Sequence, residues 1–427
     1  MMNRHEKEET RCVIPMKKQA DAHSSGQVLP TRKQRRSVRA WLPAALILAL
    51  TGAIFLYLLL TAGQGTVFNP SRLESDTVTV ERAEVLNLSY DTVQADETTP
   101  DRVEKGSQRA LVRLLSGSLA GQTAELSCMV GYFVGPKLAL GDRITVLQIV
   151  DGDSGALQEL SYYEYERAPM VWVVLGLFVL AVLLVGGKTG LKSLLGLGLT
   201  VVAMIWILCP LWMKGADPVL LAMGLCALVT VMSLVLLGGT TRKTVCAIVS
   251  TLAGVGLAAA FGVLAQKLCR VNSFQLYAVN GEIADLVNLQ SRGYPVRIHG
   301  ILTAGLLIAS LGAVMDVAMS LSSAILELHT VNPALSRRAL LGSAMRIGRD
   351  MVGTMTNTLI LAFVGSSLVT VIRLWAQGPS ARVLLNASYL SVELISALSS
   401  SIGVILTVPL AAAVGTVLFG RSKEPNK

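Results

Sequence analysis

Repeated runs of about 20 apolar residues constrain this chain more than any other feature. Hydrophobic residues make up 52% of its 427 residues and charged residues only 15%, whereas soluble globular domains carry about 25% charged residues. Because roughly 20 apolar residues in a helix cross the hydrocarbon core of a bilayer, we predict a polytopic α-helical membrane protein with about eight transmembrane helices. The expected spans are residues 41–62, 169–187, 191–213, 218–238, 244–266, 299–325, 351–373 and 395–420.

The segment between the first and second spans has a different character. Residues 63–167 hold sixteen acids against nine bases. Short alternating runs such as TVTVERAEVLNL and DRITVLQIV are separated by turns rich in Gly and Asp, which is the pattern of short strands. We therefore predict a small all-β domain of five to seven strands, either a partly open barrel or a sandwich, with no cluster of catalytic groups.

Basic residues indicate the orientation of the chain in the membrane. Residues 1–40 form a polar tail, which we expect to be disordered, with ten Lys and Arg against four acids. Since loops rich in Lys and Arg stay on the cytoplasmic side, we expect a multi-pass protein of the cytoplasmic membrane, with both termini, including residues 421–427, inside. The loop 267–298, which is expected outside, departs mildly from the rule. The expected inner basic residues are Lys188, Lys192, Arg242, Lys243, Arg337, Arg338, Arg346, Arg349, Arg421, Lys423 and Lys427.

Several functional classes are excluded by missing motifs. The net charge of +9 is explained by orientation in the lipid bilayer, so no nucleic-acid partner is expected. GGKTG resembles the end of a P-loop, but Val182 stands where that loop needs Gly. There is no H-E-x-x-H or G-x-S-x-G, and the histidines and cysteines lack metal-ligand spacing. We expect no enzyme, no cofactor and no metal; whether Cys128 and Cys269 pair is left open.

One acid inside an apolar run is the main candidate for chemistry. Asp316 lies within GAVMDVAMSLSSA, with no basic residue within ten positions on either side. A charged acid at the centre of a membrane helix costs about 2.5–3.5 kcal/mol, so such residues usually face a bundle interior or an aqueous cavity. Helical spacing places Ser320 and Ser323 on the same face.

The next span carries a complementary polar surface. In RIGRDMVGTMTNTL, Thr354 and Thr358 share a face and Asn357 lies beside them. We expect Asp316 about 13 Å, and Asn357 about 9 Å, from the cytoplasmic ends of their antiparallel spans. The two groups would then occupy one layer and face each other, forming an ion- or substrate-binding chamber with Ser320, Ser323, Thr354 and Thr358.

Charged residues precede this span. NPALSRRALLGSAMRIGRDM predicts a cytoplasmic amphipathic segment at 332–350, lying in the membrane interface. At its end, Arg346, Arg349 and Asp350 are expected either to gate the chamber or to cap the start of the membrane helix. In another span, Gly254, Ala258 and Gly262 recur every four residues, which permits close helix packing, although small residues are simply common in spans.

The polar residues leave several functions open. Asp316 could bind or relay a cation in a secondary transporter or export-related protein, or it could be protonated and merely lock two helices together. A sensing role or an unrecognised reaction is a third reading. The alternative from another class is a non-transporting scaffold or assembly factor that recruits envelope partners through its β-domain.

The same stretches carry a family resemblance. GAVMDVAMSLSSAILEL and GSAMRIGRDMVGTMTNTLILAFVG resemble the YibE/F family of bacterial multi-pass membrane proteins. The resemblance runs from about residue 80 through 419 and is strongest over 299–366. The residues that match the family pattern are Asp316, Arg349, Asp350, Gly353, Thr354, Asn357 and Thr358.

The resemblance implies a protein of the bacterial cytoplasmic membrane, of the longer YibE-like kind that carries an extracytoplasmic β-domain. Shorter YibF-like relatives lack that domain and are candidate partners, as is a second copy of the chain in a homo-oligomer. The family implies no settled activity, so function has to be argued from the chemistry of the residues.

Overall fold

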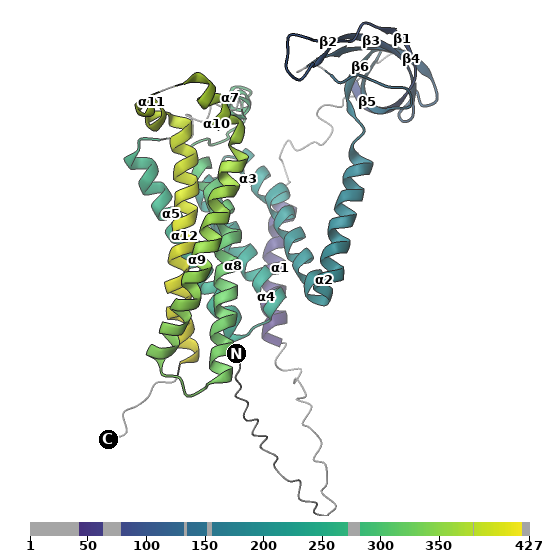
Figure 1. The fold of residues 1–427 in the computed structure, drawn as a ribbon. Coiled ribbons are helices and arrows are strands. Elements are labelled where there is room, and N and C mark those ends of the chain that lie inside the picture. Colours follow the sequence, from purple (N-terminus) through teal and green to yellow (C-terminus); the bar gives the residue numbers. More distant parts are fainter. Residues whose placement is uncertain are drawn as a thin grey trace, which may run out of the picture.

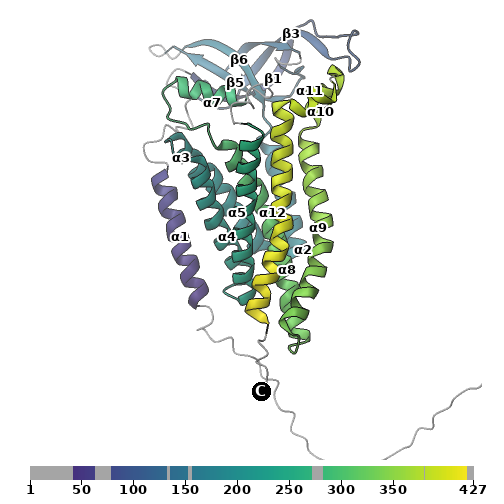
Figure 2. The ribbon, with the colours of Figure 1, turned by 90° about the vertical axis from the view of Figure 1, so that its left-hand side faces the viewer.

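The protein consists of a β-barrel and a bundle of long helices (Figures 1 and 2). The computed structural model describes residues 42–62, 78–131, 135–151, 156–271, 282–378 and 380–420. The tails 1–40 and 421–427 lie outside the described residues. The helices are α1 (Leu42–Ala62), α2 (Ala168–Val202), the π-helical segment η2 (Ala203–Leu208), α3 (Cys209–Met213), α4 (Pro218–Gly238), α5 (Arg242–Leu268), α7 (Glu282–Ser291), α8 (Ile301–Val331), α9 (Arg337–Ser366), α10 (Leu368–Gln377), α11 (Ala381–Asn386) and α12 (Ser388–Phe419).

The expected β-domain is confirmed as a small barrel. Its strands are β1 (Val78–Asp91), β2 (Gln94–Ala95), β3 (Glu104–Leu114), β4 (Thr123–Val130), β5 (Arg143–Val150) and β6 (Leu157–Tyr165). The strands pair in the order β1–β5–β6–β4–β3, and β3 pairs back with β1, which closes the ring. All these pairings are antiparallel except β4 with β6. This order is that of the five-stranded barrels known as OB-folds.

Alternation along the strands explains why the barrel forms. On β3, the side chains of Gln108, Ala110, Val112 and Leu114 are buried, whereas the residues between them are exposed. This period of two is that of a sheet with one face in a core and one in water.

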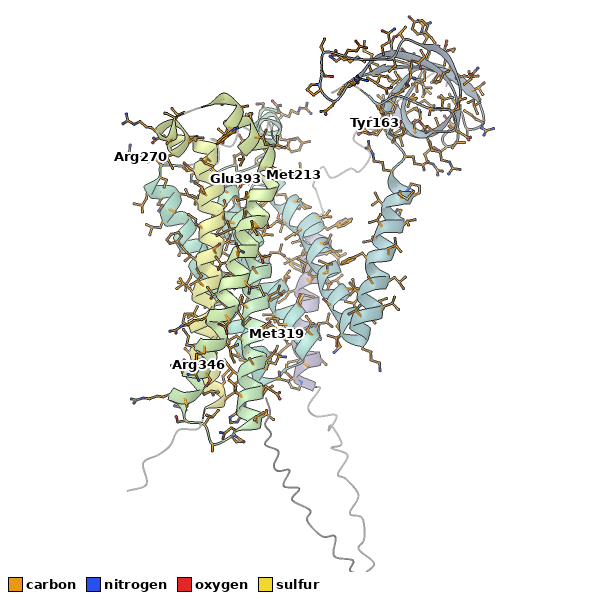
Figure 3. All side chains as sticks on the ribbon, viewed as in Figure 1. Tyr163, Met213, Arg270, Met319, Arg346 and Glu393 are labelled. Atoms are coloured by element: carbon orange, nitrogen blue, oxygen red, sulfur yellow. The ribbon has the colours of Figure 1, made fainter. Side chains whose placement is uncertain are left out.

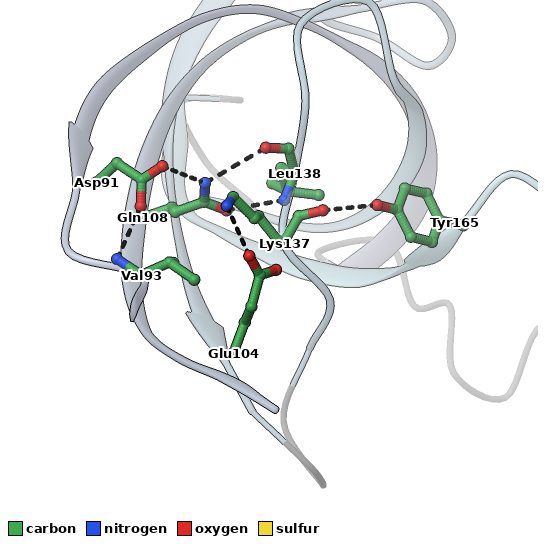
Figure 4. Close-up of polar contacts among 7 residues, drawn as sticks. All are labelled: Asp91, Val93, Glu104, Gln108, Lys137, Leu138 and Tyr165. Carbon is green, nitrogen blue, oxygen red and sulfur yellow. Dashed lines mark hydrogen bonds and ion pairs between the residues drawn. The ribbon is translucent and has the colours of Figure 1, made fainter. Parts of the chain in front are cut away.

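The buried polar member of β3 anchors a loop across the barrel. Gln108 donates to Asp91 Oδ2 (3.0 Å) and to the carbonyl of Leu138 (3.3 Å), and it accepts from the Leu138 N–H (2.8 Å) (Figure 4). The Val93 N–H, and after it the Gln108 amide, lower the pKa of Asp91. Nearby, Lys137 pairs with Glu104 at 2.8 Å. One buried amide thus satisfies the Leu138 backbone on both sides.

Long apolar helices lie at the expected spans, and two of these spans are joined in one continuous helical stretch. Among the described residues, six helical stretches are long and apolar enough to cross a membrane, or seven if the bent pair α9–α10 counts as one. One of the six runs for 46 residues, Ala168–Met213, which at 1.5 Å per residue is about twice the thickness of a bilayer core. The backbone breaks at Gly187, where φ is 52° and ψ is −131°, and the chain turns back there (Figure 1). The expected spans 169–187 and 191–213 are the two legs of this stretch.

The predicted boundary between an interfacial helix at 332–350 and a span at 351–373 is wrong. Ser336 caps a single helix, accepting from the Ala339 N–H at 3.3 Å, and α9 runs without interruption from Arg337 to Ser366. The amphipathic segment is therefore the first half of one continuous helix, which passes for a membrane span only together with α10. The break comes at the other end, where α10 is bent by 62° from α9.

Small residues bring α5, α8 and α12 into close contact, which confirms the packing role expected for the four-residue repeat. A methyl group on Gly254 of α5 would collide with Thr407 of α12 and lie 2.9 Å from Val314 Cγ1 of α8. One turn further on, Gly403 of α12 packs against Ala258. In a membrane, where water does not drive helices together, such close backbone approach supplies the association energy.

The cysteines within the described residues are all free. Cys128 is buried in the barrel, where burial raises the pKa of its thiol, and Cys269 is exposed at the end of α5. The two residues form no disulfide.

The packing at Gly254 predicts a position-specific loss of stability. Gly254→Ala should destabilise the bundle by about 1–3 kcal/mol, the usual cost of overpacking a core, because Thr407 and Val314 must move away. The matched control is Gly256→Ala on the same helix, where the added methyl group meets nothing within 4 Å. Thermal unfolding of the purified proteins in detergent measures both, and equal midpoints would contradict the assignment.

The loop anchor predicts a second loss, confined to the barrel. Gln108→Leu should destabilise the barrel by about 1–3 kcal/mol for each Leu138 backbone group left without a partner in the core. Hydrogen exchange of full-length protein should report faster exchange at residues 135–142 while the helices keep their protection. Arg109→Leu, at the exposed neighbouring position of β3, serves as the control; if both variants exchange alike, the anchor is not structural.

Candidate functional site

Asp316 occupies the midpoint of α8, fifteen residues from each end of Ile301–Val331. At 1.5 Å per residue, it lies about 22 Å from either end. It is exposed on the surface of the single chain, and within the described part of the chain no hydrogen bond or ion pair is formed by its carboxylate. The acid is thus deep within a membrane-spanning helix and lacks a protein partner.

Close contacts of two glycines with α8 and α12 show which residues of α8 and α9 lie at the same height in the bundle. Gly254 meets both Val314 of α8 and Thr407 of α12, and Gly348 of α9 meets Val408 of α12. Val314 and Gly348 therefore share one level of the bundle. Asp316 is two residues from Val314, and Arg346, Arg349 and Asp350 are within two residues of Gly348, so these four charged residues lie within about one helical turn of the same height. We call them the polar layer.

The structure contradicts one reading of the three charged residues on α9. Arg349 and Asp350 are not a cap at the start of the membrane helix, because α9 begins at Arg337, three turns earlier. All three side chains are exposed, and Arg346 donates to Ser343 Oγ at 3.0 Å. Figure 3 labels Arg346 on α9 and Met319 on α8, both in the half of the bundle away from the barrel. Their role as a gate stays a prediction.

The threonine and asparagine residues of α9 lie on its exposed surface and not at the height of Asp316. Thr354, Asn357 and Thr358 are all exposed. The two hydroxyls donate within their own helix, from Thr354 to the Met351 carbonyl (3.1 Å) and from Thr358 to the Thr354 carbonyl (2.9 Å). Asn357 is nine residues beyond Gly348, or about 13 Å nearer the barrel end.

On α8, the two predicted serines are placed differently from each other. Ser320 is exposed one turn after Asp316, on the same face. Ser323 is half-buried and donates to the Met319 carbonyl at 2.7 Å. Of the predicted set, the structure therefore brings Ser320 beside Asp316 on an open surface.

The expected chamber enclosed between α8 and α9 of one chain is not what the structure shows. The two helices pack together, and the residues they bury include Val314, Val317 and Leu321 on α8 and Ala344 and Gly348 on α9. The polar stripes point away from these packing faces. The expectation failed because both helices extend further at the end away from the barrel than the apolar runs suggested, which shifts their relative heights. The binding of an ion or substrate by these residues stays a prediction.

Two features of the site were missed in the sequence. Gly305, Ala309 and Gly312 continue the exposed Asp316 face toward the barrel, and their three- and four-residue spacing was a readable signal. In the bundle core, three hydroxyls on α5 and α12 are buried without a hydrogen-bond partner: Thr251, Ser399 and Ser400. Their spacing in the sequence does not distinguish them from serines and threonines that merely pack between close helices.

Other candidate sites offer less chemistry. A hollow of about 440 Å³ between α1 and α4 is lined almost entirely by apolar groups, and its Thr51 hydroxyl donates to the Ile47 carbonyl at 2.7 Å. Within the described ranges, no three His, Cys, Asp or Glu side chains come together to hold a metal ion. The polar layer is therefore the strongest candidate.

The fold and the site define a class, a helical membrane protein with a small β-barrel ahead of its second long apolar helix. The family model described as YibE/F-like protein matches residues 174–421. The chain therefore belongs to the YibE/F-like family. The matched segment covers the helices from α2 to α12 and neither α1 nor the barrel, so the resemblance expected from about residue 80 is found only from residue 174. No curated protein and no solved structure matches the chain.

Proposed function

We propose that this protein is a secondary transporter or export-related component of the bacterial cytoplasmic membrane, in which Asp316 binds or relays a cation. The observation that carries the proposal is an unpartnered acid at the midpoint of a membrane helix, on a face shared with Ser320. Ionisable residues at such depth are costly and usually mark ion or proton pathways. A proton is the simplest cargo, because a single carboxylate can take it up and release it.

The proposed orientation has eight spans and both termini in the cytoplasm. The first helix begins, and the last ends, at the end of the bundle away from the barrel (Figure 1). The turn at Gly187 and the start of α5 also lie at that end, and they carry Lys188, Lys192, Arg242 and Lys243. This charge distribution supports a cytoplasmic side there and an extracytoplasmic barrel.

Within this proposal the polar residues have distinct roles. Asp316 and Ser320 supply the oxygen atoms of the binding position. Thr354, Asn357 and Thr358 form a polar track on α9 that continues from the layer toward the barrel end. Arg346, Arg349 and Asp350 set the charge near Asp316 and act as the gate.

Removing the titratable group should abolish the proposed flux. Asp316→Asn keeps the size and hydrogen-bonding capacity of the side chain but cannot exchange a proton. In liposomes containing purified protein and a pH-sensitive dye, we expect the variant to lose cation-coupled proton movement while its abundance and unfolding temperature are kept.

The matched control is Glu327→Gln, an exposed acid on the same helix eleven residues from Asp316 and near the helix end. It removes one negative charge from α8 outside the polar layer, so flux should persist. Unchanged flux in Asp316→Asn would rule out coupling through this residue.

A second candidate function, an assembly factor that recruits envelope partners, is favoured by the outer surface of the barrel. Tyr90 of β1, Leu111 of β3 and Met129 of β4 are 52%, 38% and 66% exposed. On these adjacent strands Tyr90 lies opposite Arg109, which is directly opposite Ser127. Exposed aromatic and apolar side chains beside an arginine are typical of interaction sites.

This alternative makes a separate prediction. Met129→Glu together with Tyr90→Ala should abolish site-specific photo-crosslinks from position 111 to an envelope component in whole cells, because the apolar contact is lost. Proton flux should be unchanged, whereas Asp316→Asn should leave the crosslinks intact. Crosslinks that survive the double substitution would show that this surface is not the recruiting face.

A further inference from the structure

The exposed face of α8 is built for contact with another helix and not with lipid. Gly305, Ala309, Gly312, Asp316 and Ser320 follow one another at intervals of four, three, four and four residues, and all are exposed. A methyl group added at either glycine would meet nothing within 4 Å. Small residues at such spacing let a second backbone approach closely. We call this set the α8 stripe.

A lipid-facing helix of the same protein looks different. On the first leg of α2, the exposed side chains are large and apolar, for example Trp172 at 69% and Leu184 at 76%. The α8 stripe exposes a carboxylate and a hydroxyl in place of such groups. An unpaired charge at this depth costs about 2.5–3.5 kcal/mol in lipid, so the stripe needs a protein partner with a cation or donor.

The polar layer holds opposite charges that do not meet within one chain. The five ion pairs among the described residues all lie between Arg82 and Arg167, in the barrel and the start of α2. Neither Arg346 nor Arg349 forms one, although both lie near the height of Asp316. The first leg of α2 offers no charged side chain over residues 170–186, and its one hydrogen-bonding side chain there, Trp172, lies only one turn from the start of the helix at the barrel end, so this leg does not satisfy Asp316 either.

Symmetry supplies the missing partner. A two-fold axis along the membrane normal keeps every residue at its own depth, and the contact it creates uses the same surface twice. Residues that share a height in one chain can therefore meet between two chains. Asp316 on α8 and the two arginines on α9 in one layer make the surface self-complementary, whereas the apolar face of α2 is not.

We propose that a second copy of this chain docks on the exposed face of α8 and α9. The α8 stripe provides the close approach, and Asp316 of one copy pairs with Arg346 or Arg349 of the other. The opposite charges of the layer stay apart in a single chain and meet in the pair. This contact stands independently of whether the layer carries ions.

Cysteine crosslinking in native membranes tests the contact in a full-length chain whose six natural cysteines are replaced by alanine. Ala309→Cys or Ser320→Cys on the α8 stripe should give an oxidant-dependent covalent dimer. Val249→Cys, on α5 and 46% exposed, is the matched control and should stay monomeric. No dimer from either stripe position, or equal dimer from Val249→Cys, would overturn the proposal.

A charge exchange between two differently tagged copies tests the ion pair. The Ala309→Cys crosslink should be lost when both copies carry Asp316→Arg, and also when both carry Arg346→Asp with Arg349→Asp. Co-expression of one copy of each kind should restore it, because opposite charges then meet between chains. If neither set of changes weakens the crosslink, the pairing of charges is wrong. The readout needs no flux, so failure of the transport proposal leaves this result interpretable.

Discussion

The cost of leaving charge unpaired in a low-dielectric layer is the constraint on which the rest of this structure depends. Asp316 sits at the midpoint of α8 without an ion pair, and two arginines near its height are also without one. In water such groups would need no explanation. At membrane depth each is expensive unless protein or water solvates it. The arrangement of small residues around Asp316, and the assembly we propose from it, both follow from this cost.

Small residues serve two different surfaces of the bundle. In the core, side chains of neighbouring helices occupy the space beside Gly254 and Gly403, so α5, α8 and α12 pack closely together. On the open face of α8, Gly305 and Gly312 leave similar space, but a methyl group added at either one would meet no atom within 4 Å. The core shows what such spacing does when it is occupied. The open face therefore has the form of a helix contact whose second half lies on another chain.

The sequence was sufficient for elements whose physical signal is local. Long apolar runs predicted the membrane helices, and alternation over β3 and its neighbours predicted a β-domain that proved to be a barrel. The relative heights of residues on neighbouring helices could not be predicted from local patterns. The apolar run ends at 325, but α8 continues to Val331, and α9 begins within the charged segment 332–350. Beyond the apolar runs, Leu328 of α8 packs against the buried core and Leu340 of α9 is part of it. Whether a polar helix face packs against a neighbouring helix or stays exposed depends on the arrangement of the helices, which hydropathy does not predict.

The connection between barrel and bundle limits how the two parts can influence each other. β6 ends at Tyr165 and α2 begins at Ala168, so the barrel is joined almost directly to a helix whose first leg has no buried residue. That leg meets the rest of the chain at Gly187, where the backbone is not helical. Within the described residues, the covalent link from barrel to bundle is thus this leg and the non-helical residue Gly187. The second leg packs against α4, with Gly196 against Ser233, and α4 packs against α8, so the link leads by way of α4 to the helix that carries Asp316.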